Sequence, residues 1–270
     1  MKEIDGLISQ VYKHDKGYKI VKNDVSNNVC YIYCSSNALY LKDNVEDFYE
    51  KVIVRNRYEW EHIKPVFIPQ MEIYIRDIYL SWYVMGISQA VPDYDSLIAF
   101  LRNVTKGFRV RCIGASSGGF IGTMIAMELE AECISFDGQF SLINHFDHLK
   151  NNPYLRKYAH DFGTSRFELY LNSSFAQAKL VYVVSVQSEQ DSIQENLIQN
   201  AQNVDFIKIN TTKHGVALYP FALPNFLSYV SEEFEKYTKH TYTKIGISCR
   251  IGGVKKAITY FGGKLKKRRL

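Results

Sequence analysis

The sequence has few cysteines, and none of them is paired at a spacing typical of metal or redox sites. Five cysteines occur in 270 residues, without a C-x-x-C pair. Four lie inside apolar runs, where a thiol behaves as a small hydrophobic group. The odd number argues against a disulfide framework. We therefore expect reduced, mostly buried thiols and a cytoplasmic location.

Signals for export and membrane insertion are also missing. The N-terminal segment MKEIDGLISQVYKHDKG has no long apolar core. No stretch approaches the roughly 18 uninterrupted apolar residues of a membrane span. Internal repeats, low-complexity blocks and Pro/Gly-rich linkers are absent, so we expect one soluble main domain.

Motifs for several ligand classes are missing too. There is no H-E-x-x-H, no Cys/His cluster and no Asp-rich loop, so no metal is expected. The lysine of a Walker loop and the spacing G-x-G-x-x-G are absent, which disfavours a nucleotide-binding protein. Helix-turn-helix, RNP-like and zinc-finger spacings are absent, so no nucleic-acid partner is predicted.

Positive charge is concentrated at the C-terminus. The net charge is +5, and residues 255–270 hold seven Lys or Arg and no acid. A solvated, frayed tail explains this pattern. So does a weak peripheral tether to anionic lipid, at about 1 kcal/mol per basic residue near the surface. Residues 241–270 are treated as a basic extension; the sequence gives no oligomeric state.

Apolar β-rich runs alternate with helical patterns, which predicts an α/β fold with a mostly parallel sheet flanked by helices. The predicted strands are Val29–Ser35, Met71–Ile75, Phe108–Ile113, Glu132–Phe136, Leu180–Val186 and Val204–Ile209. The predicted helices are Tyr94–Val104, Gly118–Leu129, Ser192–Ala201 and Pro224–Tyr237. The polar and aromatic stretch 144–172 does not fit this alternation; it is either a lid or a surface excursion without a catalytic part.

A G-x-S-x-G pattern joins a predicted strand to a predicted helix. In Gly114-Ala115-Ser116-Ser117-Gly118-Gly119 the serine follows RVRCI and precedes FIGTMIAMELE. This context is typical of the nucleophile elbow of the α/β-hydrolase fold, whose strained turn needs small residues on either side. Ser116 is the predicted nucleophile, and the N–H of Ser117 a predicted oxyanion donor. The alternative is a structural or phosphate-binding glycine turn.

A serine nucleophile needs a base, and in this fold the partners follow in the order Ser, Asp/Glu, His. His214 lies just after the strand VDFIKIN and before the last predicted helix, so it is the predicted base. Asp191 follows the preceding strand and is the preferred acid, with Glu189 as second choice. Asp137, after the strand ECISF, is a third possibility.

The second oxyanion donor of such a site comes from the loop after an early strand. Here the loop is Ser35-Ser36-Asn37, and a backbone N–H of Ser36 or Asn37 is the predicted donor. An ordinary polar turn explains the loop as well. Asn37 is also a predicted substrate-binding residue.

Several segments resemble the α/β-hydrolase-like proteins of bacterial surface-polysaccharide loci. The likeness lies in GASSGGF, FDGQFSL, IRDIYLSWYVMG and KHG and covers roughly residues 29–225. In that family a G-S-S-x-G-G elbow is followed by an N-P-Q or S-P-Q motif, of which only Gln139 is matched here; it is the second predicted substrate-binding residue. An upstream aspartate before W-Y-x-G is matched by Asp77, Trp82, Tyr83 and Gly86.

The resemblance implies an acyl ester, O-acetyl in particular, on a sugar hydroxyl of a bacterial surface glycan. The family includes capsule O-acetyltransferases that use acetyl-CoA, and proteins known only as hydrolases. It is also similar to accessory secretion proteins that modify glycans of surface adhesins. We expect an acetyltransferase or esterase without a bound cofactor, with acetyl-CoA as an acyl donor. The alternative is a catalytically idle scaffold or glycan-binding partner in an assembly complex.

Overall fold

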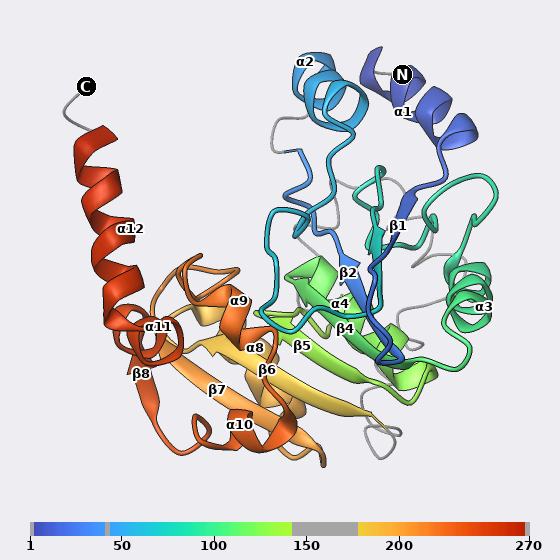
Figure 1. The fold of residues 1–270 in the computed structure, drawn as a ribbon. Coiled ribbons are helices and arrows are strands. Elements are labelled where there is room, and N and C mark those ends of the chain that lie inside the picture. Colours follow the sequence, from blue (N-terminus) through green and yellow to red (C-terminus); the bar gives the residue numbers. More distant parts are fainter. Residues whose placement is uncertain (1–2, 41–43, 142–177, 268–270) are drawn as a thin grey trace.

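In the computed structural model, which describes residues 3–40, 44–141 and 178–267, eight strands form one sheet. The strand order is β1-β3-β2-β4-β5-β6-β7-β8 (Figure 1). The strands are β1 (Tyr18–Lys22), β2 (Val29–Cys34), β3 (Met71–Ile75), β4 (Arg109–Ala115), β5 (Glu132–Phe136), β6 (Lys179–Ser185), β7 (Val204–Asn210) and β8 (Thr241–Thr243). Only β1 in this sheet is antiparallel to its neighbour, and the other pairs are parallel. The predicted fold class is confirmed.

All six predicted strands are present within two residues of their expected ends. The two edge strands β1 and β8 were not predicted from the sequence. The strand β1 has no buried residue, and β8 has three residues. Neither therefore carries the continuous apolar run by which buried parallel strands are recognised.

The sheet is buried on both faces because successive side chains point to opposite sides. Along β2, Cys30, Ile32 and Cys34 join one hydrophobic cluster, and Tyr31 and Tyr33 join the other. The first cluster packs against α3 and α4, and the second against α9, α10 and α11. The result is a helix–sheet–helix arrangement in which the strand ends carry the functional loops.

The helices follow the predicted pattern in the centre of the chain and depart from it near the ends. Their bounds are α1 (Glu3–His14), α2 (Val45–Phe48), a π-helix η1 (Tyr49–Val54), α3 (Tyr94–Val104), α4 (Ser117–Glu128), α8 (Glu189–Ile198), α9 (Leu223–Phe226), α10 (Ser231–Glu235), α11 (Lys244–Gly252) and α12 (Val254–Lys267). Helix α3 has the predicted bounds. Helix α8 begins three residues earlier than predicted, which places Asp191 in its first turn instead of in a loop.

The helix predicted over Pro224–Tyr237 is two short helices. Between them Val230 has an extended backbone, with φ −87° and ψ 170°. Ser228 Oγ donates to the carbonyl of Pro224 at 2.7 Å, a local side-chain bond that competes with regular helix continuation. The apolar spacing of this segment is kept, but its backbone turns between the two helices.

The C-terminal segment is largely part of the main body. Strand β8 pairs with β7, and Ile247 and Ile251 of α11 are buried in the core of the second cluster. The predicted boundary at residue 240 therefore falls next to a strand of the same sheet. Helix α12 then extends away from the body (Figure 1), so the basic segment is helical as far as Lys267 and is not a frayed tail up to that point.

Among the described helices, none combines the length and apolar character needed to cross a bilayer. The predicted lid 144–172, with His145, His148 and His160, lies outside the described residues.

Candidate active site

Ser116 lies in a tight, strained turn between β4 and α4. Its φ of 53° and ψ of −124° are unusual for a residue with a side chain. The Ser116 N–H donates to the carbonyl of Phe136 at 2.9 Å, which fixes the turn against the end of β5. Strain of this kind persists where the surrounding structure imposes it, and it is common at active sites.

The glycines around Ser116 are needed for close backbone packing. A Cβ at Gly114 would lie 2.0 Å from the carbonyl oxygen of Gly118, and one at Gly118 would lie 2.5 Å from that of Cys34. At Gly119 the Cβ would meet Ser135 Oγ at 2.6 Å. The small residues predicted for an elbow are thus required by contacts with helix α4, strand β2 and strand β5.

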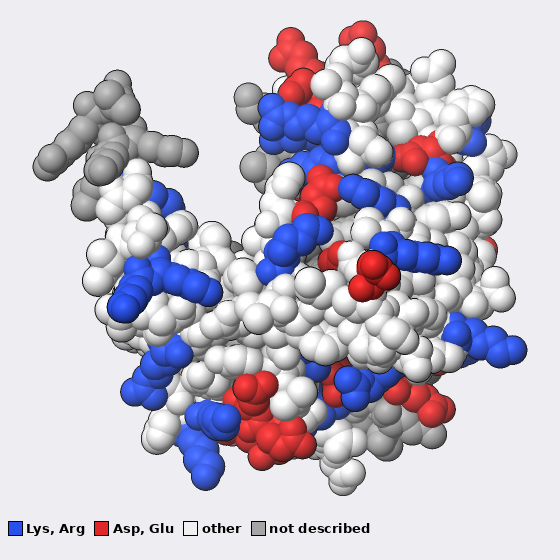
Figure 2. All heavy atoms as spheres, in the orientation of Figure 1, with Lys and Arg blue, Asp and Glu red and all other residues white. Residues whose placement is uncertain are grey.

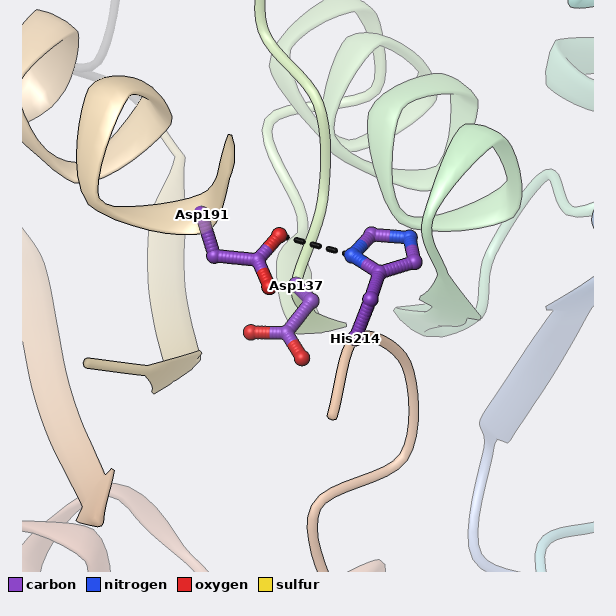
Figure 3. A group of neighbouring side chains, drawn as sticks. All are labelled: Asp137, Asp191 and His214. Carbon is purple, nitrogen blue, oxygen red and sulfur yellow. Dashed lines mark hydrogen bonds and ion pairs between the residues drawn. The ribbon is translucent and has the colours of Figure 1, made fainter. Parts of the chain in front are cut away.

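His214 and Asp191 form a hydrogen-bonded pair. His214 Nδ1 lies 2.7 Å from Asp191 Oδ1 (Figure 3). The His214 side chain is 31% exposed, whereas the Asp191 side chain is fully buried in the first turn of α8. The structure therefore brings together the preferred acid and base. Glu189, the second choice, is exposed at the start of the same helix.

Asp137 supports the loop that carries His214. Its Oδ2 accepts the Gly215 N–H at 2.9 Å, and its two oxygens accept the Ser185 N–H and Oγ–H at 2.7 Å each. Burial raises the pKa of Asp137 to about 7, and the negative charge of Asp191 adds to this rise. This third candidate acid thus holds backbone and a neighbouring serine, while Asp191 holds the imidazole.

The acidic neighbours determine the protonation of His214. Burial lowers its pKa, but the hydrogen bond and charge of Asp191, together with Asp137, outweigh burial and raise the pKa above the ordinary 6.5. A carboxylate on Nδ1 keeps the proton on that nitrogen and leaves Nε2 free to act as a base. Within the described residues, Ser116 Oγ and His214 share no hydrogen bond. Hydrogen bonds between a catalytic nucleophile and its base are often long in structures without substrate.

The same three side chains also have the donor types of a metal site. Asp137, Asp191 and His214 each offer a ligand atom, all within 4.8 Å of one another. Both Asp137 oxygens already accept hydrogen bonds, and Asp191 Oδ1 holds His214. Asp191 Oδ2 alone among these four carboxylate oxygens has no hydrogen-bond partner in the described part of the chain. The contacts present join Asp191 and His214 as an acid–base pair, with Asp137 supporting the loop of His214.

Ser116 and His214 open onto one cleft of about 660 Å³. Its wall includes Ser36 and Asn37 of the predicted oxyanion loop, Lys244 at the start of α11, and Tyr260 and Lys264 of α12. The described lining residues are Ser36, Asn37, Ala38, Arg57, Glu59, Trp60, Ile63, Ala115, Ser116, His214, Gly215, Val216, Leu218, Tyr219, Pro220, Leu223, Lys244, Tyr260 and Lys264. A volume in this range suits a small-molecule ligand.

The predicted second oxyanion donors are occupied by the protein itself. The Ser36 N–H donates to Glu59 Oε2 at 2.9 Å, and the Asn37 N–H donates to Ser117 Oγ at 3.0 Å. In this conformation neither is free for an oxyanion, contrary to the expectation. The Ser117 N–H is different because it belongs to the first helical turn, whose amides have no intrahelical acceptor.

Asn37 lines the cleft, whereas Gln139 does not appear among its described lining residues. The Gln139 side chain is 5% exposed, in the segment after β5. Its predicted contact with substrate therefore has no support in the geometry. The remaining described histidines, His14, His62 and His240, are exposed and do not line the cleft.

Asp77, which belongs to the family resemblance, stabilises the turn of residues 77–83, which contacts the predicted oxyanion loop through Tyr83. Its carboxylate accepts the N–H groups of Tyr79, Ser81 and Tyr83 at 2.6–2.9 Å. Burial raises its pKa to about 6, against the effect of these bonds. Tyr83 in turn donates its hydroxyl to the carbonyl of Ser35 at 2.8 Å, so this motif positions the loop and is itself buried.

Four charged residues of the cleft were not predicted as site residues: Arg57, Glu59, Lys244 and Lys264. Arg57 and Glu59 come from a segment for which no role was predicted, and Lys244 and Lys264 come from the basic extension, for which only a frayed tail or a lipid tether was predicted. Their proximity depends on the fold of the chain ends. The clustered basic residues after 254 are a signal in the sequence, but they do not reveal which of them faces the serine.

No family model and no curated protein matches the chain. Solved structures do resemble it. A candidate thioesterase from Silicibacter sp. TM1040 has a TM-score of 0.50 at 10% identity, over 85% of this chain and 83% of its own. MenH from Staphylococcus aureus has a TM-score of 0.42 at 11% identity, over 94% of this chain and 100% of its own. An alpha-beta serine hydrolase homologue from Coxiella burnetii has a TM-score of 0.37 at 13% identity, over 70% of this chain and 78% of its own.

At such low identity the likeness concerns the fold. The parallel sheet, the strand–turn–helix at Ser116 and the order of the site residues agree with it. The chain has the α/β-hydrolase fold.

Proposed function

We propose that the protein is a serine-dependent acyl-transfer enzyme that acts on O-acyl esters. The observation that carries the proposal is the convergence of a strained Ser116 and a carboxylate-bound His214 on one cleft. Ser116 is the nucleophile, His214 the general base and then the general acid, and Asp191 the residue that orients the imidazole.

The reaction follows from these positions. Nε2 of His214 takes the proton of the Ser116 hydroxyl as its oxygen attacks the ester carbonyl. The Ser117 N–H stabilises the resulting oxyanion, and the imidazolium returns the proton to the departing alcohol, leaving an acyl-serine. Water or an acceptor hydroxyl then takes the acyl group by the reverse sequence. Esterase and acetyltransferase thus share their first half-reaction.

The buried thiols do not compete with Ser116 as nucleophiles. Four of the five cysteines are buried, including Cys34 beside the elbow. Burial raises the pKa of the Cys34 thiol well above its ordinary value, so the reactive thiolate is not formed near neutral pH.

We propose an O-acetyl ester of a bacterial surface glycan as the substrate and acetyl-CoA as an acyl donor. The support is the sequence resemblance at GASSGGF, FDGQFSL and KHG, joined to a cleft large enough for a small acyl ester. The proposed place of action is the cytoplasm, where acetyl-CoA is available, with peripheral membrane contact through the basic C-terminal helix.

A fluorophosphonate probe tests whether Ser116 is activated. We expect covalent labelling of the native protein, abolished by heat denaturation, with the label recovered on the peptide that contains Ser116. The reason is that an unactivated serine hydroxyl is a poor nucleophile at neutral pH. A native protein that remains unlabelled would support the scaffold alternative. An exposed serine outside the cleft, Ser26, provides the control in the variant S26A, which should label like the native protein.

The direction of transfer is tested by following free CoA and free acetate separately. For a transferase we expect CoA release from acetyl-CoA only when a glycan acceptor is present. For an esterase we expect acetate release from an acetylated glycan without CoA. The distinction arises because the acyl-serine is resolved by whichever nucleophile the cleft admits. Absence of both activities with acetylated and unmodified glycans would contradict the glycan assignment.

A further inference from the structure

Basic side chains from distant parts of the chain meet at the cleft. Arg57 comes from the segment after η1, Lys244 begins α11, and Lys264 lies near the end of α12. Figure 2 shows Lys and Arg side chains on both sides of the hollow between α12 and the rest of the molecule. Among the described lining residues, Glu59 is the only acid.

Uncharged groups hold these three cations. Arg57 Nη1 donates to the carbonyls of Ala38 and Leu39 at 3.0 and 2.6 Å, and Lys244 Nζ donates to that of Val216 at 3.1 Å. Lys264 Nζ lies 4.7 Å from the centre of the Tyr260 ring. Within the described part of the chain, none of the three forms an ion pair with a carboxylate.

Glu59 does not neutralise this group. Its carboxylate accepts the N–H and the hydroxyl of Ser36 at 2.9 and 3.2 Å and so faces the oxyanion loop. Burial raises the pKa of Glu59, opposed by the Ser36 bonds and by the charge of Arg57. Among the described lining residues, three cations thus share the cleft with one carboxylate.

The lysines are close enough to repel each other. Burial lowers the pKa of Lys244, and the positive charges of Lys213 and Lys264 lower it further, while Asp137 opposes them. Like charges gathered without a counter-ion destabilise a protein, and an anionic ligand removes that penalty. Lys244 and Lys264 both line the cleft of the candidate nucleophile, whereas Lys213 is not among its described lining residues.

We propose that the substrate of this cleft carries an anionic group, a phosphate or a carboxylate, which Lys244 and Lys264 bind with the help of Arg57. The proposal rests on the proposed function only for the identity of the reacting serine. Lysine suits this task as a flexible point charge, and arginine can add a second, fixed pair of donors.

Two pairs of esters test the proposal and distinguish the two anions. The first pair is 4-nitrophenyl acetate and mono-4-nitrophenyl succinate, which adds a carboxylate. The second is S-acetylpantetheine and acetyl-CoA, which adds phosphates. We expect the native protein to have a higher kcat/KM for the anionic member of at least one pair, with the preference shrinking as salt is added.

The variants K244Q and K264Q should each reduce that preference about tenfold, the usual effect of losing one charge-assisted contact. The matched control is K256Q, because Lys256 lies on α12 but is exposed and outside the described cleft lining. It should leave the preference unchanged. Equal kcat/KM within both pairs, or an equal loss in K244Q, K264Q and K256Q, would overturn the proposal.

Binding to the variant S116A separates this inference from the proposed function. Calorimetric titration of S116A with acetyl-CoA and with the succinate ester measures affinity without turnover. The anion site would be upheld and the nucleophile overturned if S116A still turns over substrate and if adding K244Q or K264Q to S116A weakens the binding of the anionic ligands. The nucleophile would be upheld and the anion site overturned if S116A loses turnover and if K244Q and K264Q leave its affinity for the anionic ligands unchanged.

Discussion

Replacing Ser116 by alanine is expected to lower kcat/KM for ester cleavage by about 10⁴-fold or more, because it removes the nucleophile and leaves only the oxyanion donor and substrate binding. The fold should be retained. Ser116 Oγ has no hydrogen bond among the described contacts, and its N–H bond to Phe136 does not depend on the side chain. The measurement is steady-state hydrolysis of 4-nitrophenyl acetate, with thermal unfolding of the same samples.

The variant S26A serves as the matched control, since it removes a serine hydroxyl outside the cleft. It should retain full kcat/KM. Turnover in S116A within about tenfold of the native protein would exclude Ser116 as the nucleophile, provided that its Tm is unchanged.

Replacing Asp191 by asparagine is expected to lower kcat by about 10⁴-fold with little change in shape, because an amide next to His214 Nδ1 favours the wrong tautomer and no longer stabilises the imidazolium. Asp191 is fully buried, and its Oδ1 contacts His214 Nδ1 while its Oδ2 has no hydrogen-bond partner, so the change affects little besides the imidazole contact. The matched control is E189Q. Glu189 is exposed two residues earlier in the same helix and should be dispensable.

The pH profile distinguishes Asp191 from Asp137. His214 has to be neutral to accept the serine proton, so the rate falls as pH drops through its pKa. Because that pKa is raised, the loss should be centred above pH 6.5. The variant D137N removes one acidic neighbour and should move this midpoint to lower pH, with a loss in rate of less than about tenfold at high pH. A loss in D137N as large as in D191N would assign the orienting role to Asp137.

Asp137 also predicts a pH dependence of stability. Its pKa is about 7 in the folded protein against an ordinary 3.8, so the folded state binds the proton more tightly than the unfolded state. Its contribution to the free energy of unfolding is therefore greatest below pH 3.8 and is lost as pH rises towards 7. The measurement is denaturant unfolding of the native protein and of D137N over a series of pH values. In D137N the free energy of unfolding should not show this decrease between pH 3.8 and 7.

Much of the sheet could be predicted from the sequence because its central strands are buried on both faces. Such strands appear as continuous apolar runs, as in KLVYVVS of β6. The edge strands β1 and β8 lack this signal. At the C-terminus, Ile247 and Ile251 become core residues only because α11 packs on the second hydrophobic cluster. The segment KIGISCRIG has only these two large apolar side chains besides Ile245, too few to indicate a core helix.

The order of Ser116, Asp191 and His214 was accessible for a similar reason. Each follows a recognisable strand, and parallel strands deliver their C-terminal loops to one edge. The oxyanion loop was not accessible. Whether the N–H of Ser36 is free depends on Glu59, which approaches from a segment without a clear pattern.

The sequence by itself determined the six central strands, the strained serine turn and the succession of acid and histidine, since these depend on local apolar runs, small residues and chain order. Only the tertiary structure decided which carboxylate meets the imidazole, which amides are already occupied and which cations share the cleft. Those contacts join residues up to about two hundred positions apart, and their geometry follows from how helices and loops pack around the sheet, which no local pattern records.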